Sequence, residues 1–227
     1  MSDKNVTYFS ENTWYQKKVL TLDTYTYCRM CVESELKDCD SLLDIGNGGF
    51  FNYDISSIKR VVILDVCIDE SAKYGDNVTP IRGNALDFDI GEKFDIIVLQ
   101  MLIHHVTGQS PEESVKNLEA ILASCAKHLT PSGRILVIES TVPEWFHFLE
   151  KIAFRLLHRI WNFPHPLTFQ HSARQLLKSA MKVGLSIDEY TLIPMGHWVV
   201  ILGLLVPSAL TPVQPVKLVL SNPSATK

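Results

Sequence analysis

The chain has 227 residues, of which 46% are hydrophobic and 20% charged, with a formal net charge of −4 at pH 7. This length and composition fit one globular domain with a sizeable core. The small negative charge gives no electrostatic footprint for nucleic acid, which would need a basic face, and so disfavours a nucleic-acid partner. No apolar run approaches the roughly 20 residues of a membrane span. The N-terminus lacks the apolar core of a signal peptide, so we expect a cytoplasmic protein with reduced cysteines.

The first 40 residues are rich in tyrosine and tryptophan. Leu20, Tyr27, Met30 and Cys31 can share one helical stripe, which predicts helices before the first strand. Cys28 and Cys31 form a Cys-x-x-Cys pair, but a zinc site would need two further ligands at suitable spacing, and none is evident. The sequence therefore predicts no metal site.

The most informative stretch runs from residue 42 to residue 65. A short apolar strand containing Asp44 leads into Gly46-Asn47-Gly48-Gly49, and a second apolar strand ends at Asp65. Glycines let the backbone turn sharply and approach a ligand that a Cβ atom would block. A carboxylate at the tip of the next strand can accept two hydrogen bonds from a ribose diol. This stretch predicts a nucleoside-containing cofactor.

A nicotinamide cofactor is disfavoured because the Gly-x-Gly-x-x-Gly fingerprint would need a third glycine where this chain has Phe51. The pattern instead resembles motif I of the class I S-adenosylmethionine-dependent methyltransferases, acid-x-Gly-x-Gly-x-Gly. Asp44, Gly46 and Gly48 match this motif, and Phe50 departs from it.

Three later segments extend the resemblance over about residues 40–140. Residues 80–88 look like the family's Gly-Asp-Ala segment, residues 94–105 like its fourth strand and the following loop, and residues 128–139 like its Leu-x-Pro-Gly-Gly turn and fifth strand. Asn84 replaces the usual acid and Ser132 replaces a glycine. These departures leave open a non-catalytic methyltransferase-like protein that binds a partner chain.

Between residues 42 and 139 the chain is expected to alternate between strands and helices. Strands near 42–45, 61–65, 78–81, 94–99 and 134–139 are separated by helical stretches, of which Pro111 to His128 is the clearest. Strands this continuously apolar are typical of a parallel sheet covered by helices on both faces.

A bulky amphipathic helix is predicted from residue 143 to residue 161, with a basic face and an aromatic face. Three interpretations are open: a lid over the substrate pocket, a dimer or packing helix, and a membrane-surface helix through residues 145–161. A helix over 172–183 follows. Residues 185–193 and 197–206 are expected to form a closing antiparallel pair, and residues 207–227 a surface strand or arm.

The resemblance implies a Rossmann-like α/β fold in which a seven-stranded, mostly parallel sheet carries helices on both faces. The last strand would be antiparallel, and a helical insertion would follow strand five. We expect a single domain over residues 1–227, with N-terminal cap helices (1–40), a cofactor-binding core (41–140), a helical lid (141–171) and a C-terminal helix and strands (172–227).

The resemblance further implies S-adenosylmethionine as the cofactor. Its contacts are expected from Asp44, Gly46, Asn47, Gly48, Asp65, Val66, Asn84, Ala85, Leu86 and Gln100. Within this set Asp65 would bind the ribose, the glycines would line the methionine portion, and residues 84–86 would meet the adenine.

The acceptor should approach the loop after strand four, where His104 and His105 lie. Either histidine could remove a proton from a hydroxyl or a phenol, and the alternative is that both only pack or brace the loop. The aromatic residues of 143–161 suggest a small, apolar or aromatic acceptor methylated on oxygen or nitrogen.

Overall fold

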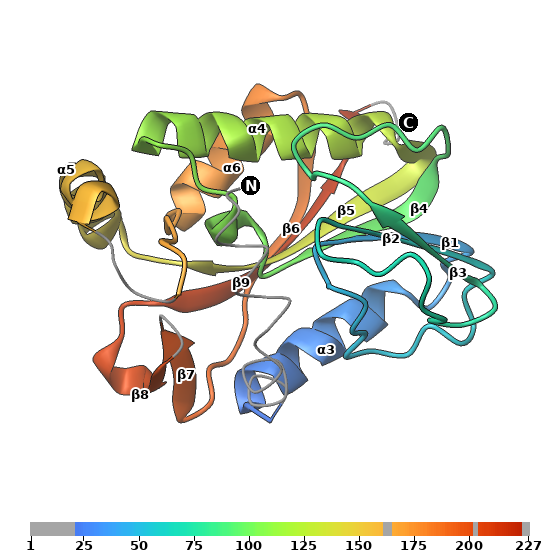
Figure 1. Cartoon of the computed structure of the whole chain (residues 1–227), viewed down its shortest axis with the longest axis horizontal. Coiled ribbons are helices and arrows are strands. Elements are labelled where there is room, and N and C mark those ends of the chain that lie inside the picture. The colour runs from blue at the N-terminus through green and yellow to red at the C-terminus, as the bar shows by residue number, and fades with distance from the viewer. Residues whose placement is uncertain (1–20, 161–164, 202–203, 224–227) are drawn as a thin grey trace.

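The computed structural model describes residues 21–160, 165–201 and 204–223. The described part contains a seven-stranded sheet in the order β3-β2-β1-β4-β5-β9-β6 (Figure 1). Its strands are β1 (Ser41–Ile45), β2 (Arg60–Asp65), β3 (Val78–Arg82), β4 (Phe94–Gln100), β5 (Leu129–Thr141), β6 (Ser186–Leu192) and β9 (Gln214–Ser221). Strands β1 to β5 pair in parallel, and β9 runs antiparallel to both β5 and β6.

Helices cover both faces of this sheet (Figure 1). Helix α3 (Asp23–Glu35) lies on one face, and α4 (Pro111–Lys127) and α6 (Ala173–Lys182) lie together on the other. Helix α5 (Glu144–Ile160) follows β5 as the expected insertion. The predicted fold class is therefore confirmed.

The two apolar cores follow from the alternation of side chains along each strand. In β1, Leu43 and Ile45 pack toward α4 and α6, whereas Leu42 packs toward Cys28 and Val32 of α3. The side chains of β2 and β4 are likewise divided between the two cores. Both faces of the central strands are therefore buried, as their continuously apolar sequences predicted.

Two helices begin where their sequences place a cap. The Ser110 hydroxyl accepts a hydrogen bond from Glu113 N–H at the start of α4, and Pro111 occupies a first-turn position that needs no N–H. The Ser172 hydroxyl accepts from Gln175 N–H at the start of α6 in the same manner. The predicted bounds of both helices are correct to within one residue.

The prediction for the C-terminal strands is wrong in its pairing. Strand β6 pairs with β9 and not with residues 197–206, which form a separate hairpin of β7 (Trp198–Ile201) and β8 (Leu204–Pro207). A surface strand or arm was expected over residues 207–227, and β9 is a strand that is buried in the sheet. Its central Lys217 makes the strand look half-solvated, but the ammonium group is buried between Glu35 and Glu189.

The expected helices between the first four strands are absent from the structure, in which residues 46–59, 66–77 and 83–93 are turns and loops. Side chains satisfy the backbone of these loops instead. The Asn77 amide donates to the carbonyl oxygens of Ile55 and Ile58, and the Arg82 guanidinium donates to that of Ile68. The connections thus hold a fixed shape without helical hydrogen bonds.

Features predicted in residues 1–20 and at Trp161 lie outside the described residues. Helix α3 is the part of the expected N-terminal helices that the structure describes, and it packs on the sheet. Among the described residues, no helix combines the length and the apolar character needed to cross a membrane.

Candidate functional site

The glycine-rich bend follows β1, beside the carboxyl end of β2. Gly46, Gly48 and Gly49 all adopt positive φ angles, of 83°, 62° and 86°. A Cβ atom on Gly46 would meet the Leu102 side chain at 2.6 Å, whereas one on Gly48 would meet no atom within 4 Å. Gly46 is thus packed against protein, and the backbone of Gly48 borders open space.

Asp44 is buried beneath this bend. Its Oδ2 accepts hydrogen bonds from Asn47 Nδ2 at 2.7 Å and from the Tyr53 hydroxyl, while its Oδ1 is buried without a hydrogen-bond partner among the described residues. Burial, opposed by these two hydrogen bonds and reinforced by the charge of Asp65, raises the pKa of Asp44 to about 7. Tyr53 was not predicted as part of the site, because nothing in its local sequence shows that it turns back onto Asp44.

Asp65 ends β2 and joins the strand to the bend. Its carboxylate accepts from Gly48 N–H at 3.1 Å and from Cys67 N–H at 2.6 Å. Burial raises the pKa of Asp65, and these backbone donors partly oppose the rise. The predicted neighbours Asp65 and Gly48 are therefore in direct contact, and Val66 continues the same loop.

The segment after β3 folds into a tight turn of its own. Asn84 is exposed, and its side-chain oxygen accepts from Leu86 N–H at 3.1 Å, while Ala85 is buried against the core. Gln100 ends β4 in register with Ile138 of β5. These residues lie on the same carboxyl edge of the sheet as Asp65, because all of them follow parallel strands.

The loop after β4 begins with a strained residue. Met101 has a φ angle of +51°, which is uncommon for a residue with a side chain, and its N–H donates to the Ile138 carbonyl at 2.7 Å. A short 3₁₀ turn over Ile103–His105 follows. Strained backbone of this kind persists only where the surroundings fix it, and it concentrates at functional sites.

His104 forms a pair with Glu139 of β5. Glu139 is buried, and its carboxylate accepts from His104 Nδ1 at 2.5 Å, from Ile103 N–H at 2.7 Å and from Ser140 N–H at 2.7 Å. Burial alone would raise the pKa of Glu139, but His104 and the two backbone donors together hold it below its ordinary value. An ionised Glu139 requires the proton of a neutral His104 to be on Nδ1, which leaves Nε2 as the proton acceptor.

His105 lies in a different environment from His104. It is buried, and its ring packs on His104 and His165 with centroid distances of 4.0 Å and 5.9 Å. Burial, together with the charges of these two histidines, holds the pKa of His105 well below its ordinary value. It is therefore neutral at physiological pH.

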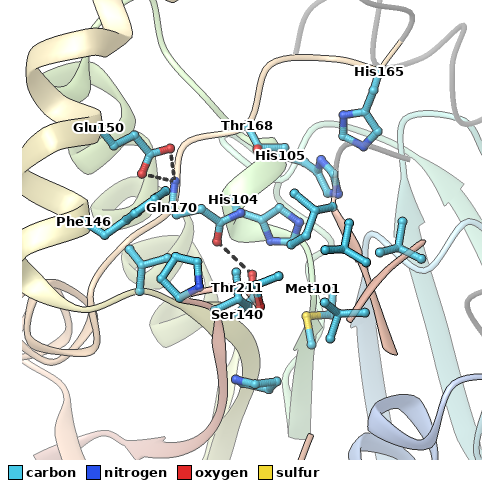
Figure 2. A pocket seen from close by; sticks show the side chains of 18 of the residues that line it. Met101, His104, His105, Ser140, Phe146, Glu150, His165, Thr168, Gln170 and Thr211 are labelled. Carbon is cyan, nitrogen blue, oxygen red and sulfur yellow. Dashed lines mark hydrogen bonds between the residues drawn. The ribbon is translucent and has the colours of Figure 1, made fainter. Parts of the chain in front are cut away.

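A cavity of about 600 Å³ opens beside His104 (Figure 2). Its walls are mostly apolar and come from α5, from the β7–β8 hairpin and from the segments at 210–215. A few polar groups converge within it. Among them are His104, Ser140, Glu150, Thr168, Gln170 and Thr211.

Glu150 is the polar group that α5 contributes to the cavity. Its carboxylate accepts from Gln170 N–H at 3.0 and 3.2 Å, and the Gln170 side-chain oxygen accepts from the Ser140 hydroxyl at 2.9 Å (Figure 2). Burial raises the pKa of Glu150 to about 7, against the opposing effects of the Gln170 N–H and His104. Glu150 was not predicted as a site residue. Its spacing of four from Phe146 does place both residues on one face of the predicted helix, and that face lines the cavity.

Solved structures share this arrangement of strands and helices. The N-methyltransferase NodS from Bradyrhizobium japonicum WM9 superposes with a TM-score of 0.56 at 14% identity, over 94% of this chain and 99% of that one. A protein from Methanosarcina mazei described as a SAM-dependent methyltransferase gives 0.55 at 13% identity, over 85% and 96%. The chain has the fold of the class I S-adenosylmethionine-dependent methyltransferases.

The mitomycin 7-O-methyltransferase MmcR has the same methyltransferase fold, with a TM-score of 0.55 at 15% identity. The alignment covers 86% of this chain and 53% of MmcR, so the chain spans about half the length of that protein. The sequence matches no protein-family model and no curated protein. The likeness at these identities establishes the methyltransferase fold, and the chemistry must be argued from the site.

Proposed function

We propose that this protein transfers a methyl group from S-adenosylmethionine to an oxygen or nitrogen atom of a small, apolar or aromatic acceptor. The observation that carries the proposal is the His104–Glu139 pair, which faces a largely apolar cavity at the carboxyl edge of a methyltransferase fold. NodS and MmcR are described as methyltransferases acting on nitrogen and on oxygen, and NodS has also been solved with S-adenosyl-L-homocysteine.

The residues around the bend fit the cofactor. The Oδ1 of buried Asp44, which has no hydrogen-bond partner in the described part of the chain, can accept a hydrogen bond from the amino group of a methionine moiety. The open space at Gly48, beside Asn47, leaves room for that moiety. Asp65 would hold the ribose, Val66 would pack beside it, and Asn84, Ala85 and Leu86 would meet the adenine, with Gln100 closing the crevice. When bound, the cofactor supplies an electrophilic methyl group on a sulfonium.

The protein's own part in the reaction is to bind, orient and deprotonate the acceptor. We infer that His104 Nε2 takes the proton of an acceptor hydroxyl while Glu139 fixes the imidazole through Nδ1. For an amine acceptor, Glu150 stands at the same cavity with a pKa of about 7 and can take the proton instead. His105, being buried and neutral, would pack behind His104.

Cofactor binding is tested by calorimetry with S-adenosyl-L-homocysteine. We expect micromolar affinity in the wild-type protein and no measurable binding in Asp65→Ala, because the ribose then loses its carboxylate acceptor. Asp188→Ala is the matched control, since Asp188 is an exposed carboxylate on β6 at the far side of the sheet. Wild-type protein that binds no nucleoside and co-purifies with another chain would instead support a non-catalytic binding role.

Catalysis is tested by a methyl-transfer screen over phenols, carboxylates and amines. With a phenol acceptor, we expect His104→Ala to lower kcat by about 10²–10⁴-fold, because general base catalysis contributes that much. The affinity for S-adenosyl-L-homocysteine should be unchanged in this variant, because His104 lies on the acceptor side. An unchanged kcat would remove His104 from the mechanism.

A cytoplasmic location remains a prediction. All five cysteines are free in the structure. We propose a small-molecule acceptor as the main partner. Helix α5 presents an exposed apolar face that a second copy or a lipid surface could cover.

A further inference from the structure

Helix α5 has a large apolar face that the described part of the protein leaves uncovered. Trp145, Phe148, Ile152, Leu156 and Ile160 recur every three or four residues, and each is more than 60% exposed. This spacing places them in one stripe along the helix. Isolated exposed apolar residues are ordinary, but a continuous stripe of this size marks an interaction surface.

The stripe lies next to the face of α5 that lines the cavity. Phe146, Glu150, Ala153 and Leu157 form that second face, again at spacings of three and four. Leu149 belongs to both faces, since it lines the cavity and is 54% exposed. The apolar surface therefore continues from the outside of the helix to the wall of the cavity.

The β7–β8 hairpin repeats this arrangement. Trp198 and Leu204 are exposed, while Val199, Val200 and Val206 line the cavity. The hairpin and α5 project from the same end of the molecule, at the left of Figure 1. Two elements that border one cavity thus both present apolar side chains outward.

The other flank of the stripe is basic. Lys151, Arg155 and Arg159 follow each other at intervals of four on α5 and are exposed. Arg155 reaches Glu112 at 3.6 Å, but both side chains are about 70% exposed, so this pair is weak and leaves the flank basic. Of the two acids on α5, Glu150 faces the cavity and Glu144 lies at the N-terminal end of the helix.

We propose that this face of α5, together with the exposed residues of the hairpin, docks on an anionic lipid bilayer surface. Aromatic and aliphatic side chains on one face with a basic flank are the features that bind interfacial helices to anionic lipids. A two-fold dimer with antiparallel α5 helices would instead bring the basic flanks of two copies close together, and a parallel one would set each basic flank against the largely apolar cavity-side face of the other copy, without acids on the stripe to neutralise the charge. Charge thus favours the bilayer over a second copy.

Docking in this way places α5 and the β7–β8 hairpin, which both form walls of the cavity, at the lipid surface. If the proposed methyltransferase function holds, the acceptor class is a lipid-soluble molecule that enters the cavity directly from the bilayer. This part of the inference rests on the proposed function, whereas docking itself does not. Vesicle binding without cofactor binding would therefore refute the function and leave the docking site standing.

The test is co-sedimentation of the full chain with vesicles made from equal parts of phosphatidylcholine and phosphatidylglycerol. We expect wild-type protein to bind these vesicles and to bind pure phosphatidylcholine vesicles more weakly, with the difference reduced by salt. The double variant Ile152→Glu/Leu156→Glu should show a partition coefficient lower by at least about tenfold, because both side chains would enter the interface.

Met181→Glu is the matched control, since Met181 is 59% exposed on α6, away from this surface. It should bind vesicles as the wild type does. Circular dichroism of each variant checks that the fold is kept. Two outcomes would overturn the proposal: a wild-type protein that stays in solution with anionic vesicles, and a double variant that binds as well as the control. Light scattering that shows a dimer dissociated by the double variant, without vesicle binding, would assign the face to a second copy.

Discussion

Asp44 combines two properties that rarely occur together in one carboxyl group. It is buried with a pKa of about 7, and one of its oxygens has no hydrogen-bond partner among the described residues. A carboxyl in this state is only partly ionised near neutral pH. A cationic ammonium group placed beside it would favour the ionised form and drive its proton into solvent.

This linkage gives a prediction about proton release. Near pH 6 we expect binding of S-adenosyl-L-homocysteine to release up to about one proton, because most Asp44 is protonated before its ammonium partner arrives. Affinity should rise with pH up to about 7 and then level off. Calorimetry in two buffers of different ionisation enthalpy measures the release, and Asp44→Asn should abolish it. Equal proton release in that variant would contradict the role given to Asp44.

The outcome for single residues shows where sequence reasoning succeeds. Gly48 and Asp65 were predicted to act together, and the hydrogen bond between them forms because consecutive parallel strands end at one edge. Tyr53 was missed because the loop after the bend folds back to bring it onto Asp44. Glu150 was missed because its position depends on how α5 is oriented toward the cavity. Neither of these is encoded in a local motif.

At the scale of elements, β9 is the most informative correction. Its apolar residues are interrupted by Lys217, which in isolation indicates a strand with one face in water. The Lys217 ammonium contacts Glu35 of α3 at 2.6 Å and Glu189 of β6 at 2.8 Å. These two partners are 182 and 28 residues away in sequence. The local sequence pattern therefore cannot show that the charge of Lys217 is compensated and that the strand can be buried.

The strand gives a prediction about stability. Lys217→Ala should lower the free energy of unfolding by about 3 kcal/mol, because Glu35 would lose a buried partner and, among the described residues, keep only its ion pair with Arg134. Lys182→Ala is the matched control: its pair with Glu119 is as short, at 2.7 Å, but the lysine is 63% exposed, so a loss of under about 1 kcal/mol is expected. Urea denaturation measures both. Equal losses of unfolding free energy in the two variants would mean that burial does not make the Lys217 ion pair more stabilising than the exposed Lys182 pair.

Four buried histidines of the described chain come from the loop after β4, from α5 and from the segment before α6. His105, His147, His165 and His171 all have pKa values below the ordinary range, chiefly because burial disfavours their charged form. For His171 the pKa falls to about 3. On unfolding, each of these side chains regains an ordinary pKa near 6.5 and binds a proton below it.

The low pKa of His171 makes the folded protein less stable as the pH falls. Between about pH 6.5 and pH 3 the unfolded state binds more protons at His171 than the folded state, so this residue removes stability as the pH falls. Relative to wild type, His171→Phe should gain about 2 kcal/mol of unfolding free energy when the pH is lowered from about 7.5 to about 5. Urea denaturation of both proteins at the two pH values gives this difference. A pH-independent difference would mean that His171 keeps an ordinary pKa in the folded protein.

The sequence predicts the sheet and its helical layers more accurately than the loops that connect the strands. Continuously apolar strands and the capped helix over 111–127 indicate a parallel sheet between helical layers, because burial on both faces leaves that pattern in the sequence. The loops of 46–59 and 66–77 could not be predicted as loops, because side chains outside each loop hold it: Asn77 binds the first and Arg82 the second. The same limit explains why the β7–β8 hairpin was mistaken for a sheet strand.

The bend after β1 has one more consequence. The N–H groups of Gly46, Gly48 and Gly49 already donate to Leu64, Asp65 and Asn47. No helix follows the bend in the structure, and two carboxylates lie beneath and beside it. A phosphate ester at this position would find these N–H groups already hydrogen-bonded and would be repelled by the two carboxylates. We therefore expect the bend to repel phosphorylated metabolites and to accept adenosine derivatives that carry no phosphate, including those with a cationic side arm.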